Sequence, residues 1–189
     1  MQANDPRAQS ILDFWFGGGD RDKRWFEKSG AFDAEVRSRF LALHEDAAAG
    51  ALAGWKKDAG DCLALIVLLD QFPRNMHRGS PRAFATDALA LDAARHALAH
   101  GHDRGMQPLE RMFVYLPFEH AESLEAQGRC CELMAALAGF PETADVPRYA
   151  VAHRDIIARF GRFPHRNAAL GRASTPEEIE FLKTPGSGF

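Results

Sequence analysis

The sequence lacks the features that mark several classes of protein. Its three cysteines, Cys62, Cys130 and Cys131, form neither a CxxC pair nor a zinc-finger spacing, so we expect reduced thiols. The opening residues MQANDPRAQS hold no charged start followed by an apolar stretch. The longest apolar run, Cys62 to Leu69, is too short to span a bilayer. These absences predict a cytoplasmic protein with no membrane partner.

Neither sign of charge dominates the chain. It carries 23 basic and 26 acidic residues and a formal net charge of -3, which gives no bulk attraction to nucleic acid or to an anionic membrane. No shift in composition, low-complexity segment or block of like charge divides the sequence. We therefore expect one domain that spans residues 1–189.

The apolar pattern is helical throughout. Strict alternation of apolar and polar residues is nearly absent, whereas apolar residues recur at helical spacing and alanine and leucine are abundant. This pattern predicts an all-α fold of eight or nine helices. The helix that ends near Phe72 lacks a polar face, so we expect it to lie centrally, with Asp61 as its N-cap. Thr175-Pro176-Glu177-Glu178 matches a capping box that opens a short final helix.

One short phrase occurs twice, each time after an apolar helical run. The copies are Phe72-Pro73-Arg74-Asn75 and Phe163-Pro164-His165-Arg166-Asn167. Because proline cannot donate the next backbone hydrogen bond, each copy predicts a helix exit. The arginines either lock the loop, by bonding helix-end carbonyls or pairing with Asp70 and Asp155, or converge with Arg162 as a clamp for a carboxylate or phosphate. Both interpretations stay open.

The segment Tyr115–Ser123 gathers a phenol, an imidazole and two carboxylates around Pro117. Proline there predicts either a kinked helix or a new one. His120 is then either a histidine packed beside the kink or a general acid or base tuned by Glu119 or Glu122.

A metal site is a further possibility that no spacing in the sequence demands. If His120, His153 and His165 met in space, with Glu122 or Asp70 as an oxygen ligand, the ligand set would suit zinc or nonhaem iron. His153 alone is more simply interpreted as a core histidine. We therefore predict no metal and no cofactor.

The phrases LLDQFPRN, FVYLPFEHAES and FGRFPHRN, together with the opening ILDFWFG and the following RWF, resemble an uncharacterised bacterial family, domain of unknown function 924. The resemblance implies an all-α fold similar to tetratricopeptide-repeat domains, in which antiparallel helix pairs stack around a concave surface. It implies no activity. The polar residues in the matching motifs are Asp70, Gln71, Arg74, Asn75, Tyr115, His120, Glu122, Arg162, His165, Arg166 and Asn167.

These residues lead to three hypotheses about function. The first is a polar pocket for an anionic small molecule, a carboxylate or phosphate, with hydrolysis or proton transfer as the reaction. Its rival is a noncatalytic helical-repeat scaffold that binds a peptide or protein in its concave groove. The third is a metal-dependent hydrolase. For the first, the candidate catalytic residues are His120, Glu122 and His165, and the candidate ligand-binding residues are Asp70, Arg74, Asn75, Tyr115, Arg162, Arg166 and Asn167.

Overall fold

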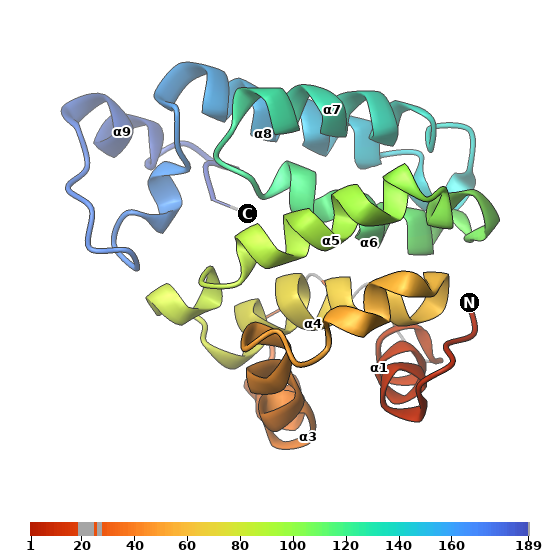
Figure 1. Ribbon diagram of the computed structural model, residues 1–189. Coiled ribbons are helices and arrows are strands. Elements are labelled where there is room, and N and C mark those ends of the chain that lie inside the picture. Colours follow the sequence, from red (N-terminus) through yellow and green to blue (C-terminus); the bar gives the residue numbers. More distant parts are fainter. Residues whose placement is uncertain (19–24, 26–27, 189) are drawn as a thin grey trace.

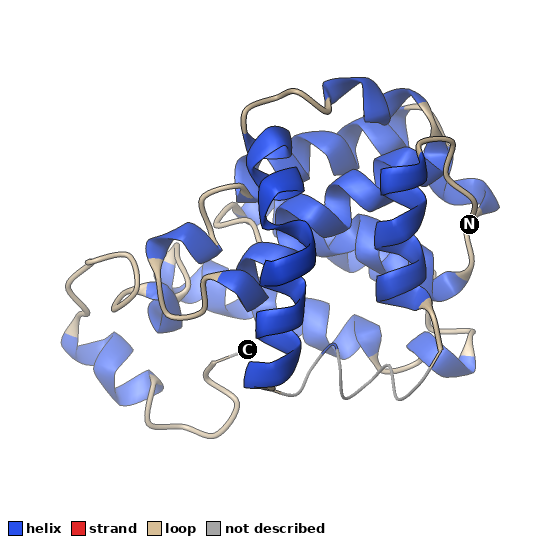
Figure 2. Ribbon diagram, turned by 90° about the horizontal axis from the view of Figure 1, so that it is seen from below, coloured by secondary structure: helices blue, strands red, loops and turns tan. Residues whose placement is uncertain are grey.

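The computed structural model describes residues 1–18, 25 and 28–188, and all the regular structure in these residues is helical (Figures 1 and 2). This confirms the all-α prediction. No helix in the described part of the chain is long and apolar enough to cross a membrane. The eight described α-helices are α1 (Pro6–Phe16), α3 (Gly30–Ala48), α4 (Ala59–Met76), α5 (Asp87–Ala99), α6 (Pro108–Glu119), α7 (Leu124–Ala135), α8 (Val146–Phe160) and α9 (Pro176–Phe181). Short 3-10 helices lie between them at Ala53–Lys57 (η1), Pro81–Ala83 (η2), His102–Gly105 (η3), Pro141–Thr143 (η4) and Pro164–Arg166 (η5).

Helix α4 is the centre of the fold, as its lack of a polar face predicts. All its residues from Asp61 to Asp70 are buried, and it packs against α1, α3, α5 and α6. Helix α6 in turn contacts α7 and α8, which pack on each other above it in Figure 1. Helix α6 therefore lies between α4 and the pair formed by α7 and α8.

The N-cap of α4 is Asp58, so the prediction that Asp61 caps this helix is wrong. The Asp58 carboxylate accepts hydrogen bonds from the backbone N–H groups of Gly60 and Asp61. Asp61 lies in the first turn, and its carboxylate accepts instead from the backbone N–H groups of Asn4 and Asp5, at 2.8 and 3.0 Å. It thereby anchors the segment before α1 to the start of α4.

The first FPRN phrase lies inside α4, so the predicted helix exit at Pro73 is wrong. Proline leaves the carbonyl of Leu69, four residues earlier, without its helical donor. The hydroxyl of Thr86, which is 4% exposed, fills that gap by donating to the Leu69 oxygen at 2.6 Å. The helix therefore continues one turn further, to Met76.

The second copy of the phrase follows a helix exit that glycine makes. Helix α8 ends at Phe160, and Gly161 takes a left-handed conformation with φ of 69°. Pro164 then opens η5. The two copies therefore differ in backbone structure: one is α-helical and the other is a tight 3-10 turn.

The segment around Pro117 combines both outcomes that the sequence left open. Helix α6 passes through Pro117 and ends at Glu119. A new helix, α7, starts after Ser123, whose hydroxyl accepts from the backbone N–H of Ala126. The predicted capping box of α9 is confirmed, because Thr175 and Glu178 bond each other's backbone reciprocally.

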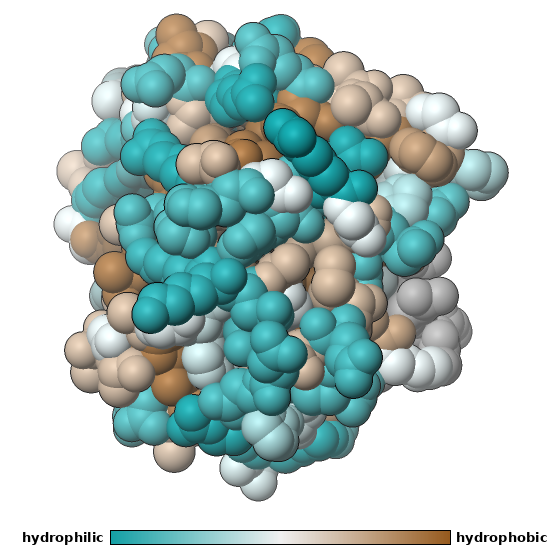
Figure 3. Space-filling model, turned by 45° about the vertical axis from the view of Figure 1, so that its right-hand side comes forward, coloured by the Kyte–Doolittle hydropathy of each residue, from teal (hydrophilic) through white to brown (hydrophobic). Residues whose placement is uncertain are grey.

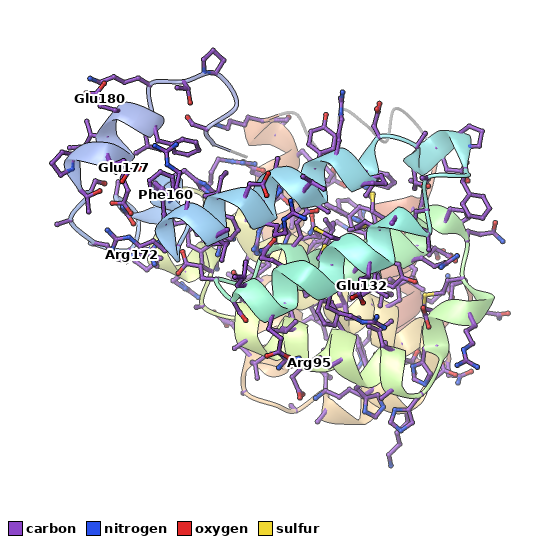
Figure 4. All side chains as sticks on the ribbon, turned by 90° about the horizontal axis from the view of Figure 1, so that it is seen from above. Arg95, Glu132, Phe160, Arg172, Glu177 and Glu180 are labelled. Atoms are coloured by element: carbon purple, nitrogen blue, oxygen red, sulfur yellow. The ribbon has the colours of Figure 1, made fainter. Side chains whose placement is uncertain are left out.

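Buried apolar side chains form two clusters. The larger one surrounds α4, and the smaller one consists of Ile156, Ile157 and Phe163, with Phe160 and Phe181 packed against it. Figure 4 shows Phe160 at the end of α8 on the same side of the molecule as Glu177 and Arg172. The face drawn in Figure 3 is mostly hydrophilic, with brown only in small separate patches.

Candidate functional site

Polar side chains from all three motif segments meet beside the C-terminal half of α4. Asp70 is 1% exposed, and its two carboxylate oxygens lie 2.8 and 2.9 Å from Nδ1 of His120 at the end of α6. The amide of Gln71 also donates to Asp70. Burial alone would raise the pKa of Asp70, but the charge of Arg74 and the contacts with His120 and Gln71 hold that pKa well below its ordinary value. Asp70 is therefore ionised.

His120 is held as a neutral imidazole with a defined tautomer. Burial and the charge of Arg74 lower its pKa, outweighing the opposite effect of Asp70. Because Asp70 can only accept, Nδ1 of His120 carries the proton and donates, and Nε2 keeps its lone pair. Nε2 has no hydrogen-bond partner among the described residues, and the side chain is 15% exposed. This arrangement allows His120 to accept a proton at Nε2.

Two arginines from the two FPRN-like phrases share one carboxylate, that of Asp87 at the start of α5. Arg74 donates to both Asp87 oxygens at 2.9 and 3.2 Å, and Arg166 donates to Oδ2 at 3.1 Å. Arg166 is 6% exposed, lies 4.7 and 4.5 Å from the ring centroids of Phe84 and Phe163, and has a buried Nε without a partner in the described structure. Burial and the charge of Arg74 lower the pKa of Arg166 to about 10. One donor of this buried cation is therefore unused.

A second histidine and carboxyl pair lies behind the first. The rings of His120 and His153 are 6.5 Å apart, and Nδ1 of His153 lies 3.6 Å from Oε1 of Glu119 and 2.8 Å from the backbone oxygen of Tyr149. Burial, reinforced by the charge of Asp70, raises the pKa of Glu119 to about 8, and burial lowers the pKa of His153 to about 3. At neutral pH this pair is uncharged, in contrast to the ionised Asp70.

His165, in η5, faces the same cluster. Its pKa is lowered to about 4, first by burial and then by the charge of Arg166, by the nearby His120 and by the charge of Arg74. Its ring lies 5.5 Å from that of Phe163. The chain passes close by at Gly188, where a Cβ would lie 3.7 Å from Cβ of His165.

Glu122 is bound to the segment after α8. Its carboxylate pairs with both terminal nitrogens of Arg172, at 2.7 and 2.9 Å, and accepts from the backbone N–H of Phe163 at 2.8 Å. These bonds keep its pKa below the ordinary value although burial acts the other way. Its oxygens therefore fix the position of the second phrase.

Arg162 and Asn167 anchor α9 rather than join Arg74 and Arg166. The guanidinium of Arg162 donates twice to the carboxylate of Glu178, at 2.6 and 2.8 Å, and the amide of Asn167 donates to the same carboxylate at 3.2 Å. Arg162 therefore does not converge with Arg74 and Arg166, as the three-arginine hypothesis expected.

Asn75 and Tyr115 also lie outside the cluster. Asn75 donates to Asp33 of α3 at 2.8 Å. The hydroxyl of Tyr115 donates to Asp103 of η3 at 2.8 Å and accepts from Arg111. Both side chains tie one helix to a neighbouring element.

The structure adds residues that lie outside the sequence motifs. Asp87, Arg172 and Glu178 are the partners of the motif residues, and Phe84 covers both arginines of the cluster. Only Asp87 had a usable signal, since an acidic residue that opens a helix close after Arg74 is a natural partner for it.

No group of three or more histidine, cysteine, aspartate or glutamate residues in the described ranges is arranged to hold a metal ion. Two surface hollows lie elsewhere: one of about 480 Å³ between α1 and α3, and one of about 260 Å³ between α8 and α9. None of the predicted site residues lines either hollow.

Comparison with known proteins agrees with the motif resemblance. No curated protein matches the chain. The solved structure of a protein of unknown function, ATU0120 from Agrobacterium tumefaciens, is 45% identical, with 93% of this chain and 96% of that chain covered and a TM-score of 0.85. A family model described as bacterial protein of unknown function (DUF924) matches residues 11–186, a span that contains every predicted site residue. The chain therefore belongs to the DUF924 family of bacterial proteins of unknown function.

Proposed function

We propose that this protein binds an anionic small molecule, a carboxylate or phosphate, beside His120 and transfers a proton through Nε2 of that histidine. One observation carries the proposal: the ionised, buried Asp70 holds Nδ1 of His120 at 2.8 Å, next to the arginine pair Arg74 and Arg166. A carboxylate in this position fixes the tautomer of the imidazole and stabilises the imidazolium that forms when Nε2 accepts a proton. The reaction class is proton abstraction from the ligand or hydrolysis by an activated water.

The arginine pair supplies the preference for an anion. Guanidinium groups bind carboxylates and phosphates through paired hydrogen bonds. Nε of Arg166 is a buried donor without a partner among the described residues, and Arg74 keeps 20% of its side chain exposed. Leaving such a donor unsatisfied costs about 1–3 kcal/mol, which an acceptor oxygen on the ligand would recover.

Among the residues named from the sequence, His120 is the proton acceptor in this proposal, and Arg74 and Arg166 bind the anion. His165 is the second group for proton transfer, because it faces the same cluster as a neutral imidazole. Glu122, Arg162 and Asn167 act indirectly, by fixing the second phrase and α9.

The competing proposal is a cytoplasmic helical-repeat scaffold that binds a peptide or protein. It is favoured by one observation: each of the helices α3 to α8 packs against the next one along the chain, as in tetratricopeptide-repeat-like stacks of antiparallel pairs. A scaffold needs no ionised carboxylate beside His120. The two proposals therefore differ in whether a His120 variant loses turnover.

A thermal-shift screen of inorganic phosphate and of phosphorylated and carboxylated metabolites tests the anion site. A ligand at about 100 times its Kd stabilises the folded state by about 2.7 kcal/mol, which is a rise in Tm of roughly 5–11 °C for a chain of this length. We expect that Arg74→Ala and Arg166→Ala abolish the shift, measured from each variant's own Tm. Arg162→Ala is the matched control, because it also loses a paired arginine but lies outside the cluster.

Turnover separates the enzyme from the scaffold. Each ligand found is incubated with wild type and with His120→Asn, and products are followed by NMR. We expect His120→Asn to bind the ligand and to lose turnover. If no anion stabilises wild type, or if Arg74→Ala and Arg166→Ala keep the full rise in Tm, the proposal of an anion site is refuted. If wild type binds a ligand but does not turn it over, only the proposal of an enzyme is refuted.

A further inference from the structure

The carboxylate of Asp87 already binds the two arginines that the proposed function assigns to the ligand. Arg74 donates to both of its oxygens, at 2.9 and 3.2 Å, and Arg166 donates to Oδ2 at 3.1 Å. Asp87 lies in the first turn of α5, and 19% of its side chain is exposed. A ligand that binds beside this pair of arginines therefore meets a negative charge.

The charges around the two arginines are already balanced. Oδ1 of Asp70 lies 3.6 Å from Nη1 of Arg74 and so adds a second carboxylate to the pair. Glu122 also acts on the pKa of Arg166, but its carboxylate is matched by its own partner, Arg172, at 2.7 Å. Two arginines are thus opposed by two carboxylates. The charge of a bound anion has to be balanced by another group.

We infer that Asp87 makes this site selective for singly charged anions, such as a monocarboxylate, over doubly charged ones, such as a phosphate monoester. The inference rests on the proposed function and adds the charge of its ligand. Specificity of this kind comes from repulsion of the wrong ligand as well as from attraction of the right one, and two like charges side by side are strongly unfavourable. Asp87 therefore selects the ligand that the two arginines bind.

The surroundings of Arg166 strengthen this repulsion. Its Cζ lies 4.7 and 4.5 Å from the ring centroids of Phe84 and Phe163, and only 6% of the residue is exposed. Charges interact more strongly here than in water, because little solvent screens them. Nε is the buried donor of this guanidinium that has no partner among the described residues. It suits a single acceptor oxygen, whereas the terminal oxygens of a phosphate monoester need several donors.

One negative charge can be balanced by one proton. Burial and then the charge of Arg166 lower the pKa of His165 to about 4, so this imidazole is neutral at pH 7. An anion bound at Arg166 offsets the charge of the arginine, and it therefore raises the pKa of His165 and favours uptake of a proton there. A second negative charge would require a second proton. His120 does not supply that balance, since it has to stay neutral to accept a proton from the ligand.

Methyl sulfate and methyl phosphate test the inference, because they have the same shape and differ by one charge. At pH 8 the phosphate monoester is doubly charged, since its second pKa is about 6, whereas the sulfate monoester carries one charge. The dissociation constant of each ester is measured at this pH by NMR titration of wild type, Asp87→Asn and Asp33→Asn. We expect wild type to bind methyl sulfate more tightly than methyl phosphate. Asp87→Asn should shift the ratio of the two constants toward methyl phosphate by at least about tenfold.

Asp33→Asn is the matched control. Asp33 also lies in the first turn of a helix, also has 19% of its side chain exposed, and binds one arginine, Arg78, through both oxygens at 2.9 Å. It lies outside the cluster, so its replacement should leave the ratio unchanged. Thermal unfolding without ligand establishes that both variants are folded. The preference of wild type is measured without any variant, so the inference can fail even if Asp87→Asn does not fold.

The outcomes separate this inference from the proposed function. If wild type binds methyl phosphate as tightly as methyl sulfate, or if Asp87→Asn leaves the ratio unchanged, the charge selectivity is refuted, while the anion site stands as long as Arg166→Ala abolishes binding. An equal shift of the ratio in Asp33→Asn would refute the selectivity as well, because the effect would not belong to the cluster. If neither ester binds wild type, the proposed anion site fails and the inference fails with it.

Discussion

The hydroxyl of Thr86 allows α4 to continue past Pro73, and its removal should have a measurable and specific cost. In Thr86→Val the Leu69 carbonyl loses the 2.6 Å hydrogen bond that replaces its missing helical donor. Valine keeps the shape of threonine, so the main effect is one buried acceptor without a partner. Such a group costs about 1–3 kcal/mol, which corresponds to a fall in Tm of roughly 2–12 °C for a chain of this size.

A double-mutant cycle with Pro73→Ala tests the cause rather than only the cost. Alanine at position 73 has the backbone N–H that proline lacks and can donate to Leu69, so the carbonyl no longer needs Thr86. We expect Thr86→Val to cost at least about 1 kcal/mol less in the Pro73→Ala background. Other consequences, such as loss of the 3.5 Å contact between Thr86 and His44 or of the proline ring, occur on both sides of the cycle and cancel.

The assay is equilibrium urea unfolding of the four proteins, followed by circular dichroism. An equal cost of Thr86→Val in both backgrounds would show that the hydroxyl does not replace the helical donor. The result bears on the candidate site as well, since Thr86 precedes Asp87 and so sets where α5 presents that carboxylate to Arg74.

Two further predictions concern carboxyl groups with opposite pKa shifts, the buried Glu119 and the partly exposed Glu122. The folded-state pKa of Glu119 is raised to about 8, so its stabilising contribution is full below pH 4.5 and is lost as the pH rises toward 8. Urea unfolding should show that the free energy of unfolding of Glu119→Gln rises relative to that of wild type across this window, by at most about 1.4 kcal/mol per pH unit. A difference between the two proteins that does not change with pH would refute a protonated Glu119. The pKa of Glu122 is lowered, chiefly by Arg172 against the effect of burial, so its contribution is present above pH 4.5 and lost on acidification. Glu122→Gln should cost about 1.5–3 kcal/mol at pH 7 and little below pH 4, whereas the same cost at both pH values would show that the pair with Arg172 is not its source.

The sequence is most informative where the reasoning depends on local chemistry. Helical periodicity predicts the all-α fold, the central α4 and the capping box of α9, because each depends on residues a few positions apart. The rule that proline ends a helix predicts the wrong end for α4, since the donor that satisfies the Leu69 carbonyl in place of position 73 is the hydroxyl of Thr86, in a different segment. No local pattern contains that contact.

The same limit applies to the candidate site. Both phrases offer arginines in similar local sequence, yet Arg74 and Arg166 meet at Asp87 whereas Arg162 binds Glu178. Which carboxylate an arginine finds is decided by helix packing over long sequence distances. Motif membership therefore identifies the polar residues but does not separate those of the cluster from those that hold α9 and η5.

Charge balance in the cluster connects the proposed anion site to the proposed proton transfer. Arg74 and Arg166 carry two positive charges, Asp70 and Asp87 carry two negative charges, and His120, His153, His165 and Glu119 are neutral at pH 7. A bound anion adds a negative charge to a site that has no net positive charge to spare. Because charges buried without compensation are costly, binding favours uptake of one proton, and His120 and His165 are the neutral bases nearest to the arginines. In the proposed reaction His165 would take up this proton, so that Nε2 of His120 stays available as the proton acceptor whose imidazolium Asp70 is placed to stabilise.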